Sequence, residues 1–414
     1  MKTLGSFSAH VTRWLALALP IVLAACGGGS DAPAAQGMGT LRLALTDAPA
    51  CGYAEVNVTV ERIRVHQSGS AGDGDSGWSE IVPSPARQID LLKLTNGALE
   101  ELGQTALPAG KYTQMRLVLA SNGGTRPLAN SVKPTGGGET ALTTPSGQQT
   151  GLKMNVNIDV EPNKMADFII DFDACKSVVR RGNSGQYNLK PVLSVLPRLM
   201  DAGARVIGYL DPTTMAAASV SVQASGVPVR ATAPDPTSGR FELYPVLPGS
   251  YDLVISGAGR VTGVMTGVPV TENTFTFVNA STQRIALGVG AAQDLSGQIA
   301  IASSITPTGV FASASQTLTG GTTVQVSAIP VDTSASSPYP YSMPLASNAP
   351  VVAPYSSAYQ SNAIPVPFVA DAASGVAGTY TVAATVTQEA SAPLVRTTAT
   401  PVSVPASGVN FSFP

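Results

Sequence analysis

The feature that most constrains this fold is the alternation of apolar and polar residues in short runs. Leu41, Leu43 and Leu45 share one face of a run whose intervening residues take the other face, which is typical of a strand buried on one side. With 41 Gly and 32 Pro among 414 residues, turns are frequent. The sequence therefore predicts an all-β protein of tandem antiparallel β-sandwich domains. The other runs with this pattern lie at 56–60, 112–119, 152–160, 168–172, 206–210, 219–223, 251–255, 323–327 and 378–382.

The first 25 residues have the composition of an export signal. Lys2 and Arg13 give a positive start, and the apolar core 15–25 is too short to span a bilayer. The core ends at Leu23-Ala24-Ala25-Cys26, which resembles a bacterial lipobox. The resemblance implies removal of 1–25 and acylation of Cys26, including palmitate, with Gly27 favouring the outer membrane. An ordinary signal peptide with a chance cysteine is the alternative.

Residues 26–38 are rich in Gly, Ala and Ser and predict a flexible lipidated tether. If Cys26 is lipidated, Cys51 and Cys175 remain. An even pair in an oxidising compartment predicts a disulfide between them. Two buried free thiols are the alternative.

The mature chain divides by composition into three parts. No Lys occurs after Lys190, and the last part is dominated by Ser, Thr, Ala, Val and Pro. We place the domains at 39–200, 201–290 and 291–414, the third as a divergent repeat of the second. A short helix is expected at 96–102, with Thr95 as its cap. The Pro- and Tyr-rich segment 338–365 is expected to be a long loop, either functional or disordered.

The first domain resembles the bacterial domain of unknown function 4382 over its whole length. The resemblance implies a lipoprotein context and no known activity. The stretches that carry it are 45–49 (LTDAP), 89–92 (IDLL), 107–117 (LPAGKYTQMRL), 172–178 (FDACKSV) and 189–192 (LKPV).

Residues 205–280 resemble carboxypeptidase-regulatory-like domains of the transthyretin-like sandwich type. The matching positions are Gly208, the run 239–243 and Pro248-Gly249-Ser250-Tyr251. Such modules usually serve as spacers or binding domains, so the resemblance implies no catalysis by this module itself.

The sequence offers few residues for catalysis. After removal of 1–25, His66 is the only histidine, and its place at the end of a strand favours an exposed structural residue. No nucleophile elbow, phosphate-binding loop or histidine-based zinc set occurs. The net charge of −2, without a block of Lys or Arg, excludes the electrostatic footprint of a nucleic-acid partner.

Carboxylates supply one metal hypothesis. If 152–160 and 166–173 form a hairpin, Asp159 lies opposite Asp167, with Asp171 and Asp173 on the same polar face. Calcium takes oxygen ligands and would relieve the repulsion. A solvated face neutralised by lysines is the alternative, and it is the one the composition favours. The run 73–77 (DGDSG) resembles a calcium loop but lacks its closing ligands, so we expect a hairpin loop there.

Aromatic residues supply the other binding candidates. Trp78, the only tryptophan after residue 25, is expected in the sandwich core, and a sugar-stacking or partner-anchoring role is the alternative. Four tyrosines in or beside the long loop suit either adaptable binding or a plain linker. These are Tyr339, Tyr341, Tyr355 and Tyr359.

The sequence thus predicts a lipid-anchored cell-envelope protein of the outer membrane, facing the periplasm or the exterior. We expect a non-enzymatic binding, spacer or scaffold module without a cofactor, held to the membrane through Cys26 and contacting a protein or glycan partner. A calcium- or small-ligand-binding module is one alternative. An accessory subunit of an envelope hydrolase is the other, and it would depend on the acids Asp47, Asp159, Asp167, Asp171 and Asp173.

Overall fold

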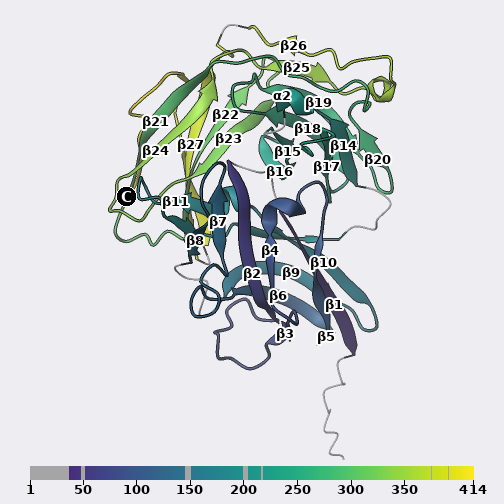
Figure 1. Ribbon diagram of the computed structural model, residues 1–414, viewed down its shortest axis with the longest axis vertical. Coiled ribbons are helices and arrows are strands. Elements are labelled where there is room, and N and C mark those ends of the chain that lie inside the picture. Colours follow the sequence, from purple (N-terminus) through teal and green to yellow (C-terminus); the bar gives the residue numbers. More distant parts are fainter. Residues whose placement is uncertain are drawn as a thin grey trace, which may run out of the picture. The chain divides into compact units, whose positions relative to one another are not determined.

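The computed structural model describes residues 37–47, 52–144, 151–198, 204–215, 218–373, 375–389 and 391–414. Residues 37–414 form one compact unit. Strands and turns make up nearly all of it, so the predicted all-β fold is confirmed (Figure 1). No helix among these described ranges has the length and hydropathy needed to cross a bilayer.

The first sandwich packs two sheets around one core. In the smaller sheet, with order β13-β10-β1-β5, Leu41, Leu43 and Leu45 of β1 all point into the core, as the alternation predicts. The strand β1 runs parallel to β10 and antiparallel to β5. The strands of this sheet are β1 (Met38–Asp47), β5 (Glu100–Pro108), β10 (Met165–Phe172) and β13 (Leu193–Pro197).

The larger sheet of the first sandwich has the order β11-β12-β8-β7-β2-β6-β9, and β3 and β4 also pair with β2. Its strands are β2 (Tyr53–His66), β3 (Ser79–Ile81), β4 (Arg87–Asp90), β6 (Gly110–Leu119), β7 (Ser131–Pro134), β8 (Thr140–Thr143), β9 (Leu152–Val160), β11 (Val178–Arg180) and β12 (Tyr187–Leu189). Two short helices, η1 (Leu91–Leu94) and α1 (Ala174–Ser177), connect strands of this sandwich.

The second sandwich combines a sheet of order β17-β14-β20 with one that begins β16-β15-β18-β19. Gly208 lies in β14, at a position where a Cβ atom would come within 2.4 Å of Phe241 and 2.5 Å of Val278. Its elements are β14 (Arg205–Tyr209), α2 (Pro212–Met215), β15 (Ser219–Ala224), β16 (Val227–Thr232), β17 (Arg240–Leu243), β18 (Gly249–Ser256), β19 (Gly263–Val270) and β20 (Phe275–Phe277).

The third sandwich has the same strand order as the second. Its sheets are β24-β21-β30 and β23-β22-β27-β28, and β21 pairs antiparallel to β24 and parallel to β30, as β14 does with β17 and β20. Its strands are β21 (Ala292–Ile301), β22 (Gly309–Thr317), β23 (Thr323–Pro330), β24 (Tyr339–Ala346), β27 (Thr379–Gln388), β28 (Ser391–Thr397), β29 (Val402–Ser403) and β30 (Phe411–Phe413).

A segment between β24 and β27 leaves the third sandwich and joins the second. This arm, residues 351–370, contains β25 (Val351–Pro354), η2 (Ser357–Gln360) and β26 (Val369–Ala370). The strand β25 pairs in parallel with β19 and extends the larger sheet of the second sandwich, with β26 beyond it (Figure 1). The predicted long loop at 338–365 is therefore wrong, because this segment contributes strands to two different sheets.

The predicted helix at 96–102 is also wrong. Asn96 and Gly97 both have positive φ and form a turn, and β5 begins at Glu100. Helical structure instead precedes this point, in η1, for which Thr95 is the C-terminal cap.

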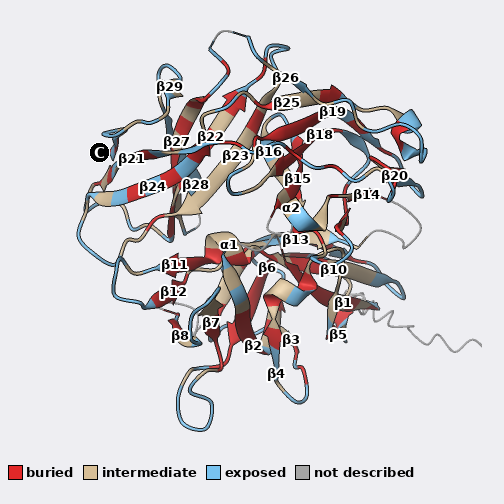
Figure 2. Ribbon diagram, turned by 45° about the horizontal axis from the view of Figure 1, so that its top comes forward, coloured by how far each residue is buried: buried red, intermediate tan, exposed pale blue. Residues whose placement is uncertain are grey.

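Figure 2 shows how burial is distributed over the fold, with buried residues on the strands and exposed residues in the connecting loops.

Candidate functional site

The arm is fastened to the second sandwich by backbone and side-chain contacts. The N–H groups of Val351 and Tyr355 donate to the carbonyl oxygens of Thr262 and Thr266, both at 2.8 Å. Tyr359 is 8% exposed and belongs to the core of the second sandwich. Tyr341 and Tyr359 are buried in sandwich cores, and Tyr339 and Tyr355 are half-buried against the same cores. The expectation of a plain linker is therefore wrong, and a binding role stays a prediction only for the two half-buried tyrosines.

A second seam joins the two sandwiches beside the arm. The buried Gln223 side chain of β15 donates to the carbonyl oxygen of Gln325 on β23 at 2.8 Å and accepts from the Gln325 N–H at 2.8 Å. Val254 and Val264 of the second sandwich form a small apolar core with Leu318 and Val324 of the third. The amide side chain of Gln223 thus pairs with both backbone polar groups of Gln325, as a neighbouring strand would do in a sheet.

A polar network joins the first sandwich to the second. Arg230 donates to the carboxylate of Asp171 at 2.5 Å and to the carbonyl oxygen of Tyr244 at 3.2 Å. The backbone N–H of Asn96 donates to the Thr232 hydroxyl at 2.9 Å. Burial raises the pKa of Asp171, and the nearby Arg230 opposes that rise.

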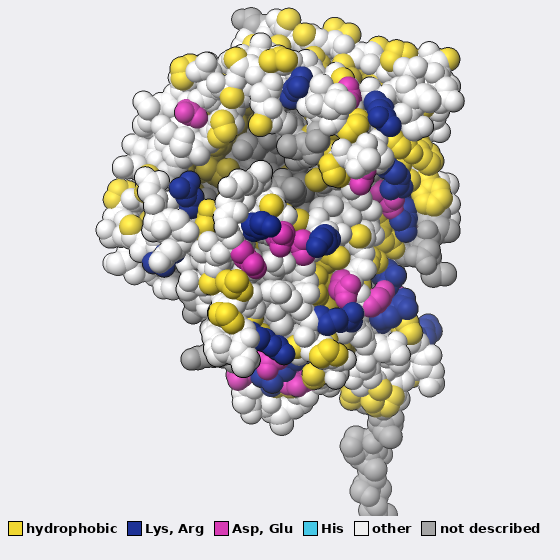
Figure 3. All heavy atoms as spheres, viewed as in Figure 1, with side chains coloured by type: hydrophobic (Ala, Val, Ile, Leu, Met, Phe, Trp, Pro, Cys, Tyr) yellow, Lys and Arg dark blue, Asp and Glu magenta, His cyan; other side chains and the backbone are white. Residues whose placement is uncertain are grey.

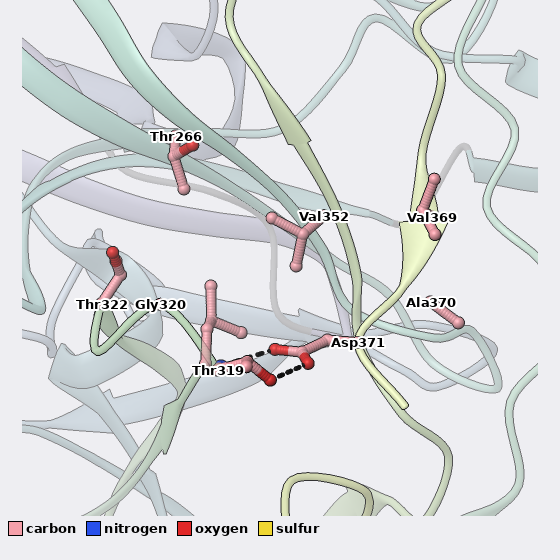
Figure 4. Close-up of a pocket in the computed structure, with 9 residues that line it drawn as sticks. Thr266, Thr319, Gly320, Thr322, Val352, Val369, Ala370 and Asp371 are labelled. Atoms are coloured by element: carbon pink, nitrogen blue, oxygen red, sulfur yellow. Dashed lines mark hydrogen bonds between the residues drawn. The ribbon is translucent and has the colours of Figure 1, made fainter. Parts of the chain in front are cut away.

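The seam pocket lies between the arm and the turn from β22 to β23. It has a volume of about 380 Å³, within the range of small-ligand sites. Figure 4 shows Asp371 pointing toward Thr319, with Thr266 and Val352 above them in this view. Its lining residues are Thr266, 318–320, Thr322, Val352 and 369–371.

Asp371 is the one charged residue of the seam pocket. The Thr319 hydroxyl donates to one carboxylate oxygen, and the Thr319 N–H donates to the other at 2.8 Å. These bonds, joined by one from the backbone of Ala373, lower the pKa of Asp371. The carboxylate is therefore ionised at neutral pH and held in place by neutral donors alone.

The acids proposed as a calcium site do not converge. The strands β9 and β10 do not form a hairpin, because β9 pairs with β6 and β10 pairs with β1 and β13 in the opposite sheet. Asp159 is exposed opposite Lys111, whereas Asp167 forms an ion pair with Arg42. The predicted register is thus wrong, and no group of three or more potential metal ligands occurs among the described residues.

The remaining acids of this set have structural partners. Asp171 pairs with Arg230, as described above. Asp173 caps α1 by accepting from the Lys176 N–H at 2.9 Å, and its other oxygen accepts from the Lys176 ammonium at 2.7 Å. Asp47 accepts a hydrogen bond from the Ala174 N–H at 2.9 Å. These carboxylates therefore fix the chain around α1.

Trp78 lies on the outer side of the first sandwich and is half-buried, so its expected place in the core is wrong. The guanidinium groups of Arg64 and Arg116 lie 4.6 and 4.9 Å from its ring centre, and the His66 ring lies 5.1 Å away. Its Nε1 donates to the Gly72 carbonyl oxygen at 2.9 Å. These contacts occupy part of the ring surface to which a sugar could stack.

The loop of 73–77 is held by the same cluster. His66 Nδ1 accepts from the Ser68 N–H at 2.8 Å, and Nε2 lies 3.0 Å from the Ser76 carbonyl oxygen, which fixes the tautomer that donates there. Asp73 forms ion pairs with Arg64 and Arg116. His66 thus has a structural position at the strand end.

The cysteines are only partly described. Cys175 lies in α1 and is not a free thiol. Cys26 and Cys51 lie outside the described residues. Lipidation of Cys26 and the pairing of Cys51 with Cys175 both stay predictions.

Sequence reasoning missed Asp371 altogether. The one signal available was its isolation, since Asp332, Asp371, Glu389 and Arg396 are the only charged residues after 300.

The surface charges do not form a block of one sign. Figure 3 shows Lys and Arg side chains interleaved with Asp and Glu on one face of the molecule.

Comparison with known proteins bears on the first sandwich. Residues 38–191 match the family model "Domain of unknown function (DUF4382)", as the resemblance of this region implies. This part of the chain is therefore similar to that domain, whose description names no activity. No curated protein matches the chain.

Two solved structures are similar to parts of the chain. One is a C-terminal interface mutant of a type II cohesin-X-dockerin complex from Acetivibrio cellulolyticus, with 27% identity over 21% of this chain and a TM-score of 0.18. The other is a leucine-rich repeat protein from Bacteroides thetaiotaomicron, with 10% identity over 58% of this chain and a TM-score of 0.15. The chain spans 59% and 26% of their lengths, and TM-scores this low carry no argument.

Proposed function

We propose that this chain is a lipid-anchored, non-enzymatic scaffold of the cell envelope that holds a binding surface in a fixed position. The observation that carries the proposal is the docking of the arm onto β19. Together with the seams at Gln223 and Arg230, it leaves the three sandwiches joined by packed contacts instead of free linkers. A display or spacer protein benefits from such rigidity, because little conformational entropy is then lost when a partner binds.

The second sandwich fits this role as a module of the transthyretin-like type. Gly208, whose Cβ would collide with Phe241, and Tyr251, whose hydroxyl donates to the Leu247 carbonyl oxygen at 2.8 Å, give physical reasons for two of its motif positions. We infer that the third sandwich, with its matching strand order, is a divergent copy that acquired the arm.

Membrane attachment is tested by substituting Cys26→Ser. The parent is expected in the outer-membrane fraction and to incorporate labelled palmitate, and the variant to lose both properties. Ser30→Ala, in the same tether, is the matched control and should behave as the parent. Unlabelled parent chain in a soluble fraction would contradict the proposal.

The orientation and the scaffold role are tested on intact and permeabilised cells. Antibody labelling of the third sandwich on intact cells would place it at the surface, whereas labelling only after permeabilisation would place it in the periplasm. Cross-linking in the labelled compartment should then capture a partner protein or glycan. An enzymatic activity that depends on Asp159, Asp167, Asp171 or Asp173 would instead favour the hydrolase alternative.

A further inference from the structure

The seam pocket has a feature that core packing does not explain. Val369 is 68% exposed at its rim, although Val352 and Leu318 form an apolar wall beside it. Apolar surface that stays in contact with water is unfavourable, and here it lies directly beside an ionised carboxylate. A ligand with an apolar part and a polar end would satisfy both.

The pocket offers hydrogen-bond acceptors to a ligand, namely the Asp371 carboxylate and two threonine hydroxyl oxygens. The two N–H and O–H donors of Thr319 are already committed to Asp371. The hydroxyls of Thr266 and Thr322 have no hydrogen-bond partner among the residues that the structure describes, so their oxygens are available to a ligand. The lining includes no Lys, Arg or His to neutralise Asp371.

These properties select one ligand chemistry. A primary ammonium group has three donors and no acceptor, so it matches a carboxylate flanked by hydroxyl oxygens. An unbranched aliphatic stem matches the wall of Val352, Leu318 and Val369. Neutral sugars fit less well, because the lining has no aromatic or amide side chain, and an anion would be repelled.

We propose that the seam pocket binds a primary ammonium group carried on an unbranched aliphatic stem. Two sources share this chemistry, a lysine side chain of a protein and a free aliphatic diamine. The proposal goes beyond the scaffold role and does not depend on lipidation or on location.

The test is saturation-transfer difference NMR with the purified full-length chain. The probes are n-pentylamine and 1-pentanol, which share a stem and differ in the charged end. Pentylamine should give a saturable signal in the millimolar range that falls as salt is added, and pentanol should bind at least about tenfold more weakly. Equal signals from the two probes would overturn the proposal.

Two variants locate the binding. Asp371→Asn should weaken pentylamine binding about tenfold, whereas Glu389→Gln, which removes an exposed charge from the same sandwich, should leave it unchanged. Gly320 lines the pocket, and a Cβ there meets no atom within 4 Å, so Gly320→Leu should narrow the pocket while Asp371 and Thr319 stay paired. If Asp371→Asn does not fold, loss of signal in Gly320→Leu supports the site, and retention of signal overturns it.

Competition experiments distinguish a protein lysine from a free diamine as the natural ligand, with pentylamine as the bound probe that each competitor should displace. A blocked tripeptide with a central lysine that competes as well as cadaverine would assign the site to a protein partner's lysine. Competition by cadaverine alone would assign it to a free diamine. Failure of both to compete would overturn the proposal.

Discussion

At the residue scale, the contacts that join the sandwiches depend on single polar side chains at buried positions. Gln223 is 1% exposed and Arg230 is 5% exposed, and each bonds across a seam to another sandwich. A buried polar group that loses its partner costs more than an exposed one, because water does not replace the lost bond. These positions should therefore be more sensitive than exposed polar residues nearby.

The raised pKa of Asp171 predicts that the stability of the folded chain depends on pH. Its pKa in the folded state lies above its ordinary value of 3.8, because burial outweighs the attraction of Arg230. The folded state thus binds the proton more tightly, and this contribution to stability is complete below 3.8 and lost as the pH rises through the folded pKa. Asp171→Asn should gain stability relative to the parent across that rise, measured by urea unfolding between pH 3.5 and 7. A relative loss would mean that the ion pair dominates.

Gln223→Leu should destabilise the chain by about 1–2 kcal/mol, because it leaves the N–H and carbonyl oxygen of Gln325 without their side-chain partner. Chemical unfolding of parent and variant measures the difference. Gln298→Leu, an exposed glutamine of β21, is the control and should change stability by less than about 0.5 kcal/mol. Equal effects of the two substitutions would show that the Gln223 seam adds no stability.

At the scale of elements, alternation located strands well but did not say which sheet each strand joins. The runs at 152–160 and 168–172 both become strands, yet they enter opposite sheets of the first sandwich, so the calcium geometry built on a hairpin failed. Side chains alternate with a period of two in either sheet, and the four-residue connection between β9 and β10 can cross between sheets as well as turn within one.

The arm was missed for a related reason. Its partner β19 lies more than 80 residues earlier in the chain, and parallel pairing leaves no hairpin signal in the sequence. Its prolines indicated a loop, but Pro354 ends β25 and does not interrupt it. Asp371 was missed with it, since this carboxylate becomes part of a pocket only when the arm is docked.

The first and second sandwiches share a hydrogen-bonded tyrosine that the sequence predicted only in part. Tyr112 and Tyr251 each donate from the hydroxyl to the carbonyl oxygen four residues earlier, Pro108 and Leu247, at 3.0 and 2.8 Å. The Gly-x-Tyr run that residues 110–112 and 249–251 share therefore has a physical basis in a hydrogen-bonded corner. Tyr380 of the third sandwich bonds instead to Ala346, so its Gly-x-Tyr run does not form the same corner.

Tyr359→Ala should release the arm, because it removes the arm's buried anchor from the core of the second sandwich. Hydrogen exchange at the N–H groups of Val351 and Tyr355 should then become at least about tenfold faster, while strands β14 to β18 stay protected. Val369→Ala, an exposed position in the same arm, is the control and should leave exchange unchanged. Uniform acceleration over the whole chain would contradict local docking.

Pro393 predicts how the edge strand β28 avoids pairing. The Thr398 N–H donates to the Val382 carbonyl oxygen, so the alternation of the ladder points the backbone N–H groups of Thr397 and Val395 away from β27. Pro393 follows at the point where the register of β27 and β28 shifts. A proline has no N–H, so at this irregular point a fully exposed edge strand without lysine offers one donor fewer to another chain. Pro393→Val should raise the apparent mass in light scattering at high concentration, and Ala392→Val should not. An unchanged mass in Pro393→Val would refute this role.

At the scale of the whole molecule, the central claim is that the three sandwiches act as one body. The arm, the Gln223 seam and the Arg230 network each cross between sandwiches, and residues 37–414 form one compact unit. The strand orders of the second and third sandwiches are the same, and the third differs by the arm and by the short strand β29, which pairs with β27. Rigidity of this kind requires that the sandwiches unfold together.

Calorimetry of the chain from residue 26 onward, carrying Cys26→Ser so that no acyl chain is attached, tests this claim most directly. We predict one thermal transition whose calorimetric and van't Hoff enthalpies agree, which is the signature of a cooperative unit. Tyr359→Ala should split this transition. Two or three separate transitions in the parent chain would contradict the account and describe independent domains on linkers.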